Sequence, residues 1–324
     1  MTGKAGKMRV FVTRQIPQVG LDMLEEHFEV TVNPYDRVLT EEELIEGVTD
    51  AHGLLCLLTD AITSKVMDAS PYLKVISNYA VGYNNIDVVA ATQRGIPVTN
   101  TPGVLTDATA DLAWALIMSV GRRIVEGDTY TRKGRFVGWG PMLLLGGAVA
   151  GKTLGIVGMG RIGQAVARRA TGFDMPILYH DVERVHSVEE LYNARYVSLD
   201  ELLETSDFVT LHAPLTDGTK HMVGKRELGM MKKTAYLINT ARGPLVDEQA
   251  LVEALREGVI AGAGLDVYED EPKLATGLAE LPNTVLLPHL GSATLETRSK
   301  MAEMAASNVI AALRGETPPN LVEV

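Results

Sequence analysis

A glycine-rich segment in the middle of the chain constrains the fold more than any other feature. Gly158, Gly160 and Gly163 stand in the spacing G-x-G-x-x-G, an apolar segment (153–157) leads into them, and a helix-like segment (161–170) follows. In this setting the glycines allow a tight turn, a close approach of the backbone to a pyrophosphate, and close packing of the helix on the strand. The helix N-terminus then offers N–H groups and a partial positive charge to the phosphates. The segment predicts a dinucleotide site, with a glycine turn of an ordinary α/β protein as the alternative.

An acidic residue strengthens this prediction. The next apolar segment (175–180) is followed directly by Asp181. This position is close to the offset of about 20 residues at which an acid binds the ribose hydroxyls of a dinucleotide. The strand, the helix and the acid together place the motif in the context that a dinucleotide-binding fold requires.

Composition narrows the class of protein. The chain has 324 residues, enough for two domains, and a formal net charge of −11. Nucleic acid and anionic membranes need a basic surface, so neither is expected as a main partner. We find no signal peptide and no apolar run near the ~18 residues of a membrane span. The single cysteine, Cys56, lies in an apolar run, which favours a buried structural thiol and a reducing, cytoplasmic location.

Strand-like and helix-like segments alternate almost throughout the chain, which predicts parallel sheets with helices on both faces. Strands of the first part are expected at 9–12, 29–32, 53–57, 75–77 and 97–99. Strands of the second part are expected at 153–157, 177–179, 208–211, 235–239, 261–266 and 285–287. Helices are expected between them, among others at 17–27, 41–48, 87–94 and 108–123, and at the end at 295–313. The pattern predicts an α/β fold with two domains, one continuous sheet being less compatible with this length.

Polar residues follow several strands of the second part, where a parallel sheet binds its ligands. Arg242 precedes a Gly-Pro turn and could offer a fork of donors to a carboxylate, with a surface ion pair as an equal alternative. Asp266 ends a strand, and within the acidic cluster 269–271 the pattern alone selects no member. His289, in a Pro/Gly turn after an apolar strand, is the histidine best placed for acid–base chemistry. His212, which also ends a strand, is its competitor and could instead line the cofactor pocket.

Such a set of groups suits the reduction of a keto acid. Hydride transfer to a keto group needs a proton for the carbonyl oxygen, which histidine can supply because its ordinary pKa lies near neutral pH. A nearby carboxylate would stabilise the imidazolium, and an arginine would hold the substrate carboxylate. A dinucleotide site with Arg, Glu and His at later strand ends therefore predicts a keto-acid reductase.

The chain resembles the D-isomer-specific 2-hydroxyacid dehydrogenases over nearly its whole length. The resemblance is carried by the glycine loop 158–163, by 239–247 (NTARGPLVD), by 264–272 (GLDVYEDEP) and by 287–292 (LPHLGS). Within the family the chain is most similar to the glyoxylate/hydroxypyruvate reductases. That similarity is carried by 78–87 (NYAVGYNNID), 101–111 (TPGVLTDATAD) and 138–142 (GWGPM).

The resemblance implies roles for the candidate residues. Arg242 would bind the substrate, Glu271 would partner the catalytic histidine, and His289 would be the acid/base. Backbone N–H groups at 81 and 82 would bind the substrate carboxylate. The residues expected to contact the substrate are Leu58, Val81, Gly82, Arg242, His289 and Trp139. The residues expected to contact the cofactor are Gly158, Met159, Gly160, Arg161, Ile162, Gly163, Asp181, His212, Ala213, Pro214, Thr240, Ala241, Asp266 and Thr106.

The resemblance also implies an architecture. Residues 1–100 with 291–324 would form a flavodoxin-like substrate-binding domain. Residues 101–290 would form a Rossmann NAD-binding domain inserted into it, and the cleft between the domains would close by a hinge motion. The glycine-rich loop 134–151 would carry Trp139 to the active site of a partner subunit, which implies a homodimer. Plain interface packing of Trp139 would imply a dimer as well. No metal is implied.

The expected cofactor departs from part of the family. Several of these reductases prefer NADPH, but here the second strand of the cofactor domain is followed by Asp181. A carboxylate hydrogen-bonds the ribose 2′-hydroxyl and repels a 2′-phosphate. Glu183 would add to the repulsion, while Arg184 would weaken it. We therefore expect NAD(H) to be preferred over NADP(H).

The expected activity is the reduction of glyoxylate or hydroxypyruvate to glycolate or D-glycerate. One alternative is the oxidation of phosphite, D-lactate or another small D-2-hydroxy acid on the same scaffold. A second alternative is a non-catalytic NAD-sensing scaffold, as in the corepressor branch of the family, which can keep the Arg242, Glu271 and His289 set.

Overall fold

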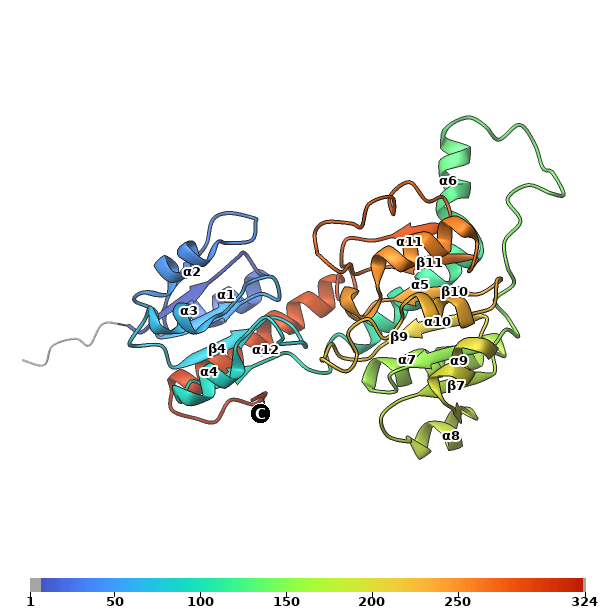
Figure 1. The fold of residues 1–324 in the computed structure, drawn as a ribbon. Coiled ribbons are helices and arrows are strands. Elements are labelled where there is room, and N and C mark those ends of the chain that lie inside the picture. Colours follow the sequence, from blue (N-terminus) through green and yellow to red (C-terminus); the bar gives the residue numbers. More distant parts are fainter. Residues whose placement is uncertain (1–6, 323–324) are drawn as a thin grey trace, which may run out of the picture. The chain divides into compact units, whose positions relative to one another are not determined.

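The computed structural model describes residues 7–322, which form two compact units (Figure 1). One unit combines the described residues up to Leu105 with those from Ser292 onward, and the other unit is Thr106–Gly291. The chain therefore leaves the first unit once, builds the second, and returns. No helix within residues 7–322 is long and apolar enough to cross a membrane.

The first unit is built on a five-stranded parallel sheet in the order β2-β1-β3-β4-β5. This is the strand order of flavodoxin-like folds. The strands are β1 (Arg9–Val12), β2 (Glu29–Val32), β3 (Gly53–Cys56), β4 (Val75–Asn78) and β5 (Val98–Thr99). All four residues of β3 and of β4 are buried, as expected for strands covered on both faces.

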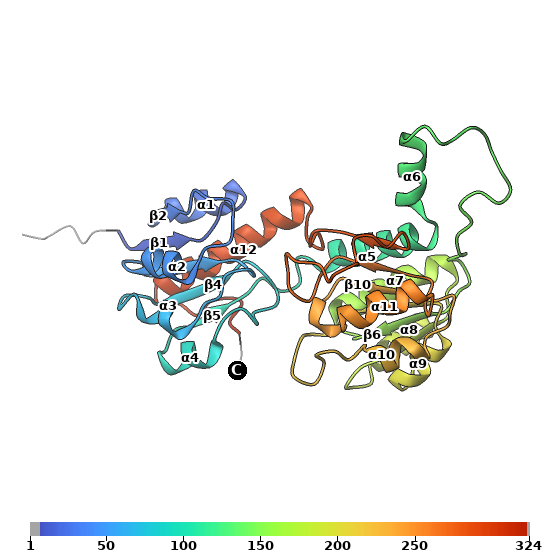
Figure 2. The ribbon, with the colours of Figure 1, turned by 45° about the horizontal axis from the view of Figure 1, so that its top comes forward.

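Helices cover both faces of this sheet (Figure 2). The helices are α1 (Gln18–Glu25), α2 (Glu41–Val48), α3 (Ser64–Asp68), α4 (Val88–Gln93) and α12 (Leu295–Leu313). Helix α12 packs on α1 so closely that a β-carbon at Gly20 would stand 2.8 Å from that of Ala302. The small residues of both helices thus explain why the C-terminal helix belongs to the first unit.

Local signals in the sequence fix several helix ends. The side chain of Thr40 accepts from the backbone N–H of Glu43, and the Glu43 side chain accepts from that of Thr40, forming a capping box at the start of α2. Asp87 caps α4 more simply, because its side chain accepts the N–H of Ala90 with no hydrogen bond in return. Gly95 follows α4 with a φ of +65°, a conformation that glycine adopts at low cost.

The second unit is built on a seven-stranded parallel sheet in the order β12-β11-β10-β9-β6-β7-β8. Counted within the unit this order is 7-6-5-4-1-2-3, the Rossmann arrangement with one further strand at its edge. The strands are β6 (Leu154–Val157), β7 (Ile177–His180), β8 (Arg195–Tyr196), β9 (Phe208–Leu211), β10 (Tyr236–Asn239), β11 (Gly262–Leu265) and β12 (Thr284–Leu286). The sequence pattern predicted six of them and missed β8, whose two residues are both exposed.

Helices again cover both faces (Figures 1 and 2). The helices are α5 (Thr106–Gly121), α6 (Ile124–Arg132), α7 (Arg161–Ala170), α8 (His186–Tyr192), α9 (Leu199–Thr205), α10 (Lys225–Met230) and α11 (Glu248–Glu257), with 3₁₀ turns at Thr171–Phe173 and Gly243–Leu245. Helices α5 and α7 share one apolar core, and α9, α10 and α11 share the other. After α6 the chain runs to β6 without a helix or strand, as predicted for 134–151.

Candidate active site

The glycine loop joins β6 to α7 at the carboxyl end of the strand. Gly158 has a φ of +92°, and a β-carbon there would stand 2.6 Å from the backbone nitrogen of Ala213. A β-carbon at Gly163 would stand 2.1 Å from the carbonyl oxygen of Gly158, whereas at Gly160 no atom lies within 4 Å. The loop is therefore packed where it meets the sheet and open at Gly160, the position at which the motif admits a pyrophosphate.

Asp181 follows β7 and lies against this loop. Its carboxylate accepts the backbone N–H of Met159 at 2.5 Å and that of Val182 at 2.6 Å. The hydroxyl of Tyr196 donates to its carbonyl oxygen at 3.1 Å. The acid thus stands beside the turn that the motif assigns to the phosphates, as a ribose-binding carboxylate requires.

Two buried polar atoms on this edge of the sheet lack hydrogen-bond partners among the described residues, namely Thr240 Oγ1 and His212 Nδ1. Both belong to segments predicted to line the cofactor, after β10 and β9. An unsatisfied buried polar atom is costly, so its partner is expected to come from outside the chain. The open glycine turn, Asp181 and these two atoms fit a dinucleotide.

The structure separates the two candidate histidines. His212 Nε2 is 2.9 Å from the hydroxyl of Thr210, and burial lowers the pKa of His212 to about 3. His212 is therefore neutral at physiological pH and is a poor proton donor. His289 instead pairs its Nδ1 with Glu271 Oε2 at 3.0 Å, and about a quarter of its side chain (27%) is exposed.

The acidic cluster 269–271 is also resolved into separate roles. Glu271 faces His289, whereas Glu269 Oε1 lies 2.6 Å from Nε2 of His221, and Asp270 forms an exposed ion pair with Lys273. Burial raises the pKa of Glu271, but the hydrogen bond and charge of His289, the N–H of Tyr268 and the charge of Arg242 together leave that pKa lowered. Glu271 thus stays ionised beside the imidazole.

Sequence reasoning missed the support of this acidic loop. Glu248, at the start of α11, is buried, and its carboxylate accepts the backbone N–H groups of Glu269 at 2.7 Å and Ala275 at 2.8 Å. A glutamate is mostly exposed in proteins, and one in the first turn of a helix is already accounted for by the helix dipole. Only the fold shows that it anchors the loop that carries Glu271.

Arg242 lies in the turn after β10. Burial lowers the pKa of its guanidinium, and the charge of Glu271 acts in the opposite direction. The side chain of Asn239 brackets the turn by donating to the carbonyl of Arg242 at 2.9 Å and accepting from the N–H of Ala241 at 3.0 Å. A half-buried cation next to the Glu271–His289 pair has the charge and the donors that binding an anion requires.

Asp266, directly after β11, holds the turn that carries His289. Its carboxylate accepts the N–H groups of Leu290 at 2.6 Å and Gly291 at 2.8 Å, and its carbonyl accepts the N–H of His289 at 2.9 Å. Burial raises the pKa of Asp266, while these two N–H groups and His289 oppose that rise. The predicted contact of Asp266 with a cofactor would come in addition to this structural role.

The remaining predicted residues lie in four places. Leu58 follows β3, and Val81 and Gly82 follow β4, all three in the first unit. Thr106 begins α5 in the second unit. Trp139, in the loop after α6, is 85% exposed. Cys56 is buried at the end of β3, and burial raises the pKa of its thiol, as expected for a structural cysteine.

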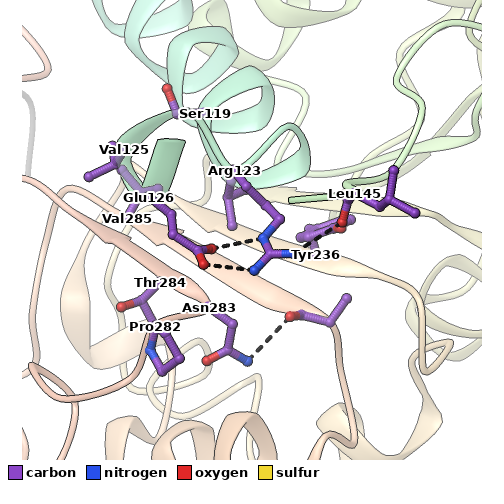
Figure 3. Close-up of a pocket in the computed structure, with 12 residues that line it drawn as sticks. Ser119, Arg123, Val125, Glu126, Leu145, Tyr236, Pro282, Asn283, Thr284 and Val285 are labelled. Atoms are coloured by element: carbon purple, nitrogen blue, oxygen red, sulfur yellow. Dashed lines mark hydrogen bonds and ion pairs between the residues drawn. The ribbon is translucent and has the colours of Figure 1, made fainter. Parts of the chain in front are cut away.

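A cavity of about 250 Å³ lies at the opposite edge of the second sheet (Figure 3). Its lining includes Tyr236 and Thr284, the first residues of β10 and β12, together with the ion pair of Arg123 and Glu126. The catalytic candidates lie at the carboxyl ends of the strands, so this cavity is separate from them. Within residues 7–322 no group of three or more His, Cys, Asp or Glu is arranged to hold a metal ion.

Comparisons with known proteins agree with this arrangement. A family model described as "D-isomer specific 2-hydroxyacid dehydrogenase, NAD binding domain" matches residues 114–291. The chain is 56% identical over 318 residues to the glyoxylate reductase of Korarchaeum cryptofilum, covering 98% of this chain and 96% of that one. It is 53% identical over 320 residues to the glyoxylate reductase of Thermococcus gammatolerans, with 98% and 96% covered.

Solved structures show the same similarity. A crystal structure of a protein from Thermus thermophilus matches with a TM-score of 0.93 at 49% identity, covering 98% of this chain and 100% of that chain. The NADPH-dependent glyoxylate/hydroxypyruvate reductase of Sinorhizobium meliloti, in complex with NADP and malonate, matches with a TM-score of 0.86 at 35% identity. That match covers 98% of this chain and 97% of that chain.

Proposed function

This chain belongs to the D-isomer-specific 2-hydroxyacid dehydrogenase family, and on that premise we propose that it reduces glyoxylate and hydroxypyruvate to glycolate and D-glycerate with NADH. The observation that carries the proposal is the contact of 3.0 Å between His289 Nδ1 and Glu271 Oε2 beside Arg242. Relatives more than 50% identical over almost the full length bear the name glyoxylate reductase, which supports this choice of substrate.

The geometry supports a separate role for each of three residues. Glu271 holds Nδ1 of His289 and stabilises the imidazolium, so Nε2 is the atom that delivers a proton to the substrate's carbonyl oxygen. Arg242 binds the substrate through its guanidinium and orients the carbonyl. Bound NADH supplies the hydride. As the product forms, His289 is left neutral and is protonated again from solvent, to which part of its side chain is exposed.

The cofactor is proposed to lie along the carboxyl edge of the second sheet. The glycine loop 158–163 would hold the pyrophosphate, and Asp181 would accept hydrogen bonds from the ribose hydroxyls. Thr240 and His212 would satisfy their unpaired atoms on the cofactor. A preference for NADH rests on the carboxylate of Asp181. The similar enzyme from Sinorhizobium meliloti is NADPH-dependent, so the preference is a property to be tested in this chain.

The first unit is proposed to be the substrate-binding domain, with the second unit as the NAD-binding domain. Backbone N–H groups of Val81 and Gly82 would bind the substrate carboxylate, and Leu58 would pack against the substrate. These residues all follow strands of the first sheet, at the edge where parallel sheets bind ligands.

A homodimer is also proposed. The loop after α6 exposes several large apolar side chains close together in sequence, namely Phe136, Val137, Trp139, Met142 and Leu145. Monomers rarely leave such groups uncovered, so a second copy of the chain is the expected partner, with Trp139 reaching its active site. A buried, protonated Cys56 is compatible with a reducing, cytoplasmic location.

The direct test is NADH consumption by the purified protein with glyoxylate, with hydroxypyruvate, with pyruvate and without any keto acid, followed for wild type and His289→Ala. We expect turnover of the first two acids, and a loss of about 10²–10⁴-fold in kcat for the variant with NADH binding retained. His221→Asn is the matched control, because His221 also pairs with a glutamate and Asn tolerates its φ of +53°.

The outcomes separate the alternatives. Unchanged turnover in His289→Ala would show that another group donates the proton. The NAD-sensing scaffold would be favoured instead if the protein binds NADH tightly but neither reduces any 2-keto acid nor oxidises any 2-hydroxy acid.

A further inference from the structure

Three consecutive carbonyl groups in the loop after β4 are each held by a fixed donor. The carbonyl of Ala80 accepts the backbone N–H of Thr101 at 2.8 Å. The carbonyl of Val81 accepts Nδ2 of Asn100 at 2.8 Å, and that of Gly82 accepts Nδ2 of Asn78 at 2.8 Å. Two of the three donors are side-chain amides from the ends of neighbouring strands, β4 and β5.

Holding these carbonyls also fixes the direction of the N–H groups between them. In a planar trans peptide the C=O of one residue points opposite to the N–H of the next. The Ala80 carbonyl therefore sets the direction of the Val81 N–H, and the Val81 carbonyl sets that of the Gly82 N–H. Neither N–H donates to an acceptor within residues 7–322, and both residues are partly exposed, so a ligand can reach them.

Asn100 is itself held by the C-terminal part of the chain. Its carbonyl accepts Nδ2 of Asn308 at 3.1 Å, and its N–H donates to the carbonyl of Asn320 at 3.2 Å. Asn308 lies on α12, is completely buried, and uses its Oδ1 to accept the N–H of Asn320 at 3.2 Å. A buried amide whose donor and acceptor are both used gives a rigid support.

We propose that Asn100, supported by Asn308, is a positioning residue that aims the N–H groups of Val81 and Gly82 at the carboxylate of the substrate. The inference rests on the proposed function, in which these N–H groups bind that carboxylate. An asparagine is required at 100 because a carbonyl must be met by a donor. An aspartate of the same shape would place an acceptor against the Val81 carbonyl.

The experiment compares wild type with Asn100→Ala and Asn100→Asp. Steady-state kinetics give kcat and KM for glyoxylate, protein fluorescence gives the Kd for NADH, and calorimetry gives the Kd for oxamate, an unreactive carboxylate analogue, in the presence of NADH. We expect KM for glyoxylate and Kd for oxamate to rise about tenfold, the effect of weakening one or two hydrogen bonds to a charged group. We expect kcat to change by less than about twofold and the Kd for NADH not to change.

Asn283→Ala is the matched control. Like Asn100, Asn283 donates from its side-chain amide to the backbone, in its case to the carbonyls of Leu255 and Ala261, but at the amino edge of the other unit's sheet. A thermal melt of each variant shows whether it is folded. Asn308→Ala, which leaves the Asn100 side chain in place, serves as the second variant and is expected to raise KM in the same direction by a smaller factor.

The inference and the proposed function fail in different ways. If folded Asn100→Ala and Asn100→Asp keep the wild-type KM and oxamate Kd, the positioning role is wrong, whatever the wild-type activity. If kcat falls, NADH binding weakens and KM rises together, Asn100 is merely structural and the inference is overturned. If the wild type itself reduces no 2-keto acid, the proposed function fails, while oxamate binding still decides the role of Asn100.

Discussion

The backbone of Gly243 packs directly against the backbone of Tyr268. A β-carbon at Gly243 would stand 1.8 Å from the Tyr268 carbonyl oxygen. The turn after β10, which carries Arg242, is thereby pressed onto the segment after β11, which carries Glu271. The backbone N–H of Tyr268 in turn donates to Glu271 Oε1 at 3.1 Å. A contact that only glycine permits therefore helps to hold the turn that carries the arginine against the segment that carries the glutamate.

We expect Gly243→Ala to separate these two segments. Forcing a methyl group into a packed region destabilises a protein by about 1–3 kcal/mol, and a misplacement of about 1 Å in a catalytic group reduces turnover about 10²-fold. A fall in kcat/KM for glyoxylate together with a lower Tm would be the result. Gly229→Ala is the control, because no atom lies within 4 Å of a β-carbon at that position of α10. Full activity of Gly243→Ala would contradict the argument.

The cofactor preference follows from Asp181. We expect wild type to have a higher kcat/KM with NADH than with NADPH, because the carboxylate repels a 2′-phosphate. Asp181→Ser should shift the NADPH-to-NADH ratio of kcat/KM by at least about tenfold, which corresponds to about 1.4 kcal/mol. The ratio is the useful measure, since losing the contact with the Met159 N–H affects both cofactors alike. Asp22→Ser, on the exposed face of α1, should leave the ratio unchanged, and a wild type that prefers NADPH would refute the prediction.

Much of the fold was predictable from short-range patterns. The strands 9–12 and 29–32 and the helices 41–48 and 295–313 were predicted with the bounds that the structure has. Their apolar spacing and their caps lie within a few residues of each other, so the sequence carries the signal locally. Strand β8 was missed because Arg195–Tyr196 is a short, exposed edge strand without an apolar pattern.

The location of the candidate site was predictable from the sequence, but the contacts between its side chains were not. Parallel strands end at one edge of a sheet, so Asp181, Arg242, Asp266 and His289 could be assigned to that edge from the order of the strands. Which acid meets which histidine depends on the turns, and the residue pattern alone did not choose Glu271 over Glu269. The hydrogen bond from Asn308 to Asn100 joins residues 208 positions apart, and no local sequence pattern predicts such a contact.

The exposed loop after α6 leads to a prediction about assembly. Light scattering is expected to show a dimer for the wild type. Replacing Val137, Trp139 and Met142 with serine should shift the protein toward the monomer, because these side chains are 94%, 85% and 78% exposed in a single chain. Leu191→Ser, which changes a lone exposed leucine on α8, is the control and should leave the mass unchanged. A wild type that stays monomeric at all concentrations would rule out the homodimer.

His212 leads to a prediction about stability and pH. Burial lowers its pKa to about 3 in the folded chain, whereas an unfolded histidine titrates near 6.5. Between these values the unfolded chain binds a proton that the folded chain does not. The contribution of neutral His212 to stability is thus complete above about pH 6.5 and is lost as the pH falls toward 3.

The measurement is the free energy of unfolding in urea at pH 7.5 and at pH 5.5, for wild type and His212→Gln. Lowering the pH is expected to destabilise wild type by about 1 kcal/mol more than the variant, since each pH unit below the unfolded pKa contributes at most about 1.4 kcal/mol. Comparing the two proteins cancels the other titrating groups. Equal pH sensitivity in both proteins would mean that His212 accepts a proton in the folded state. His212 could then not line the cofactor site as a neutral ring.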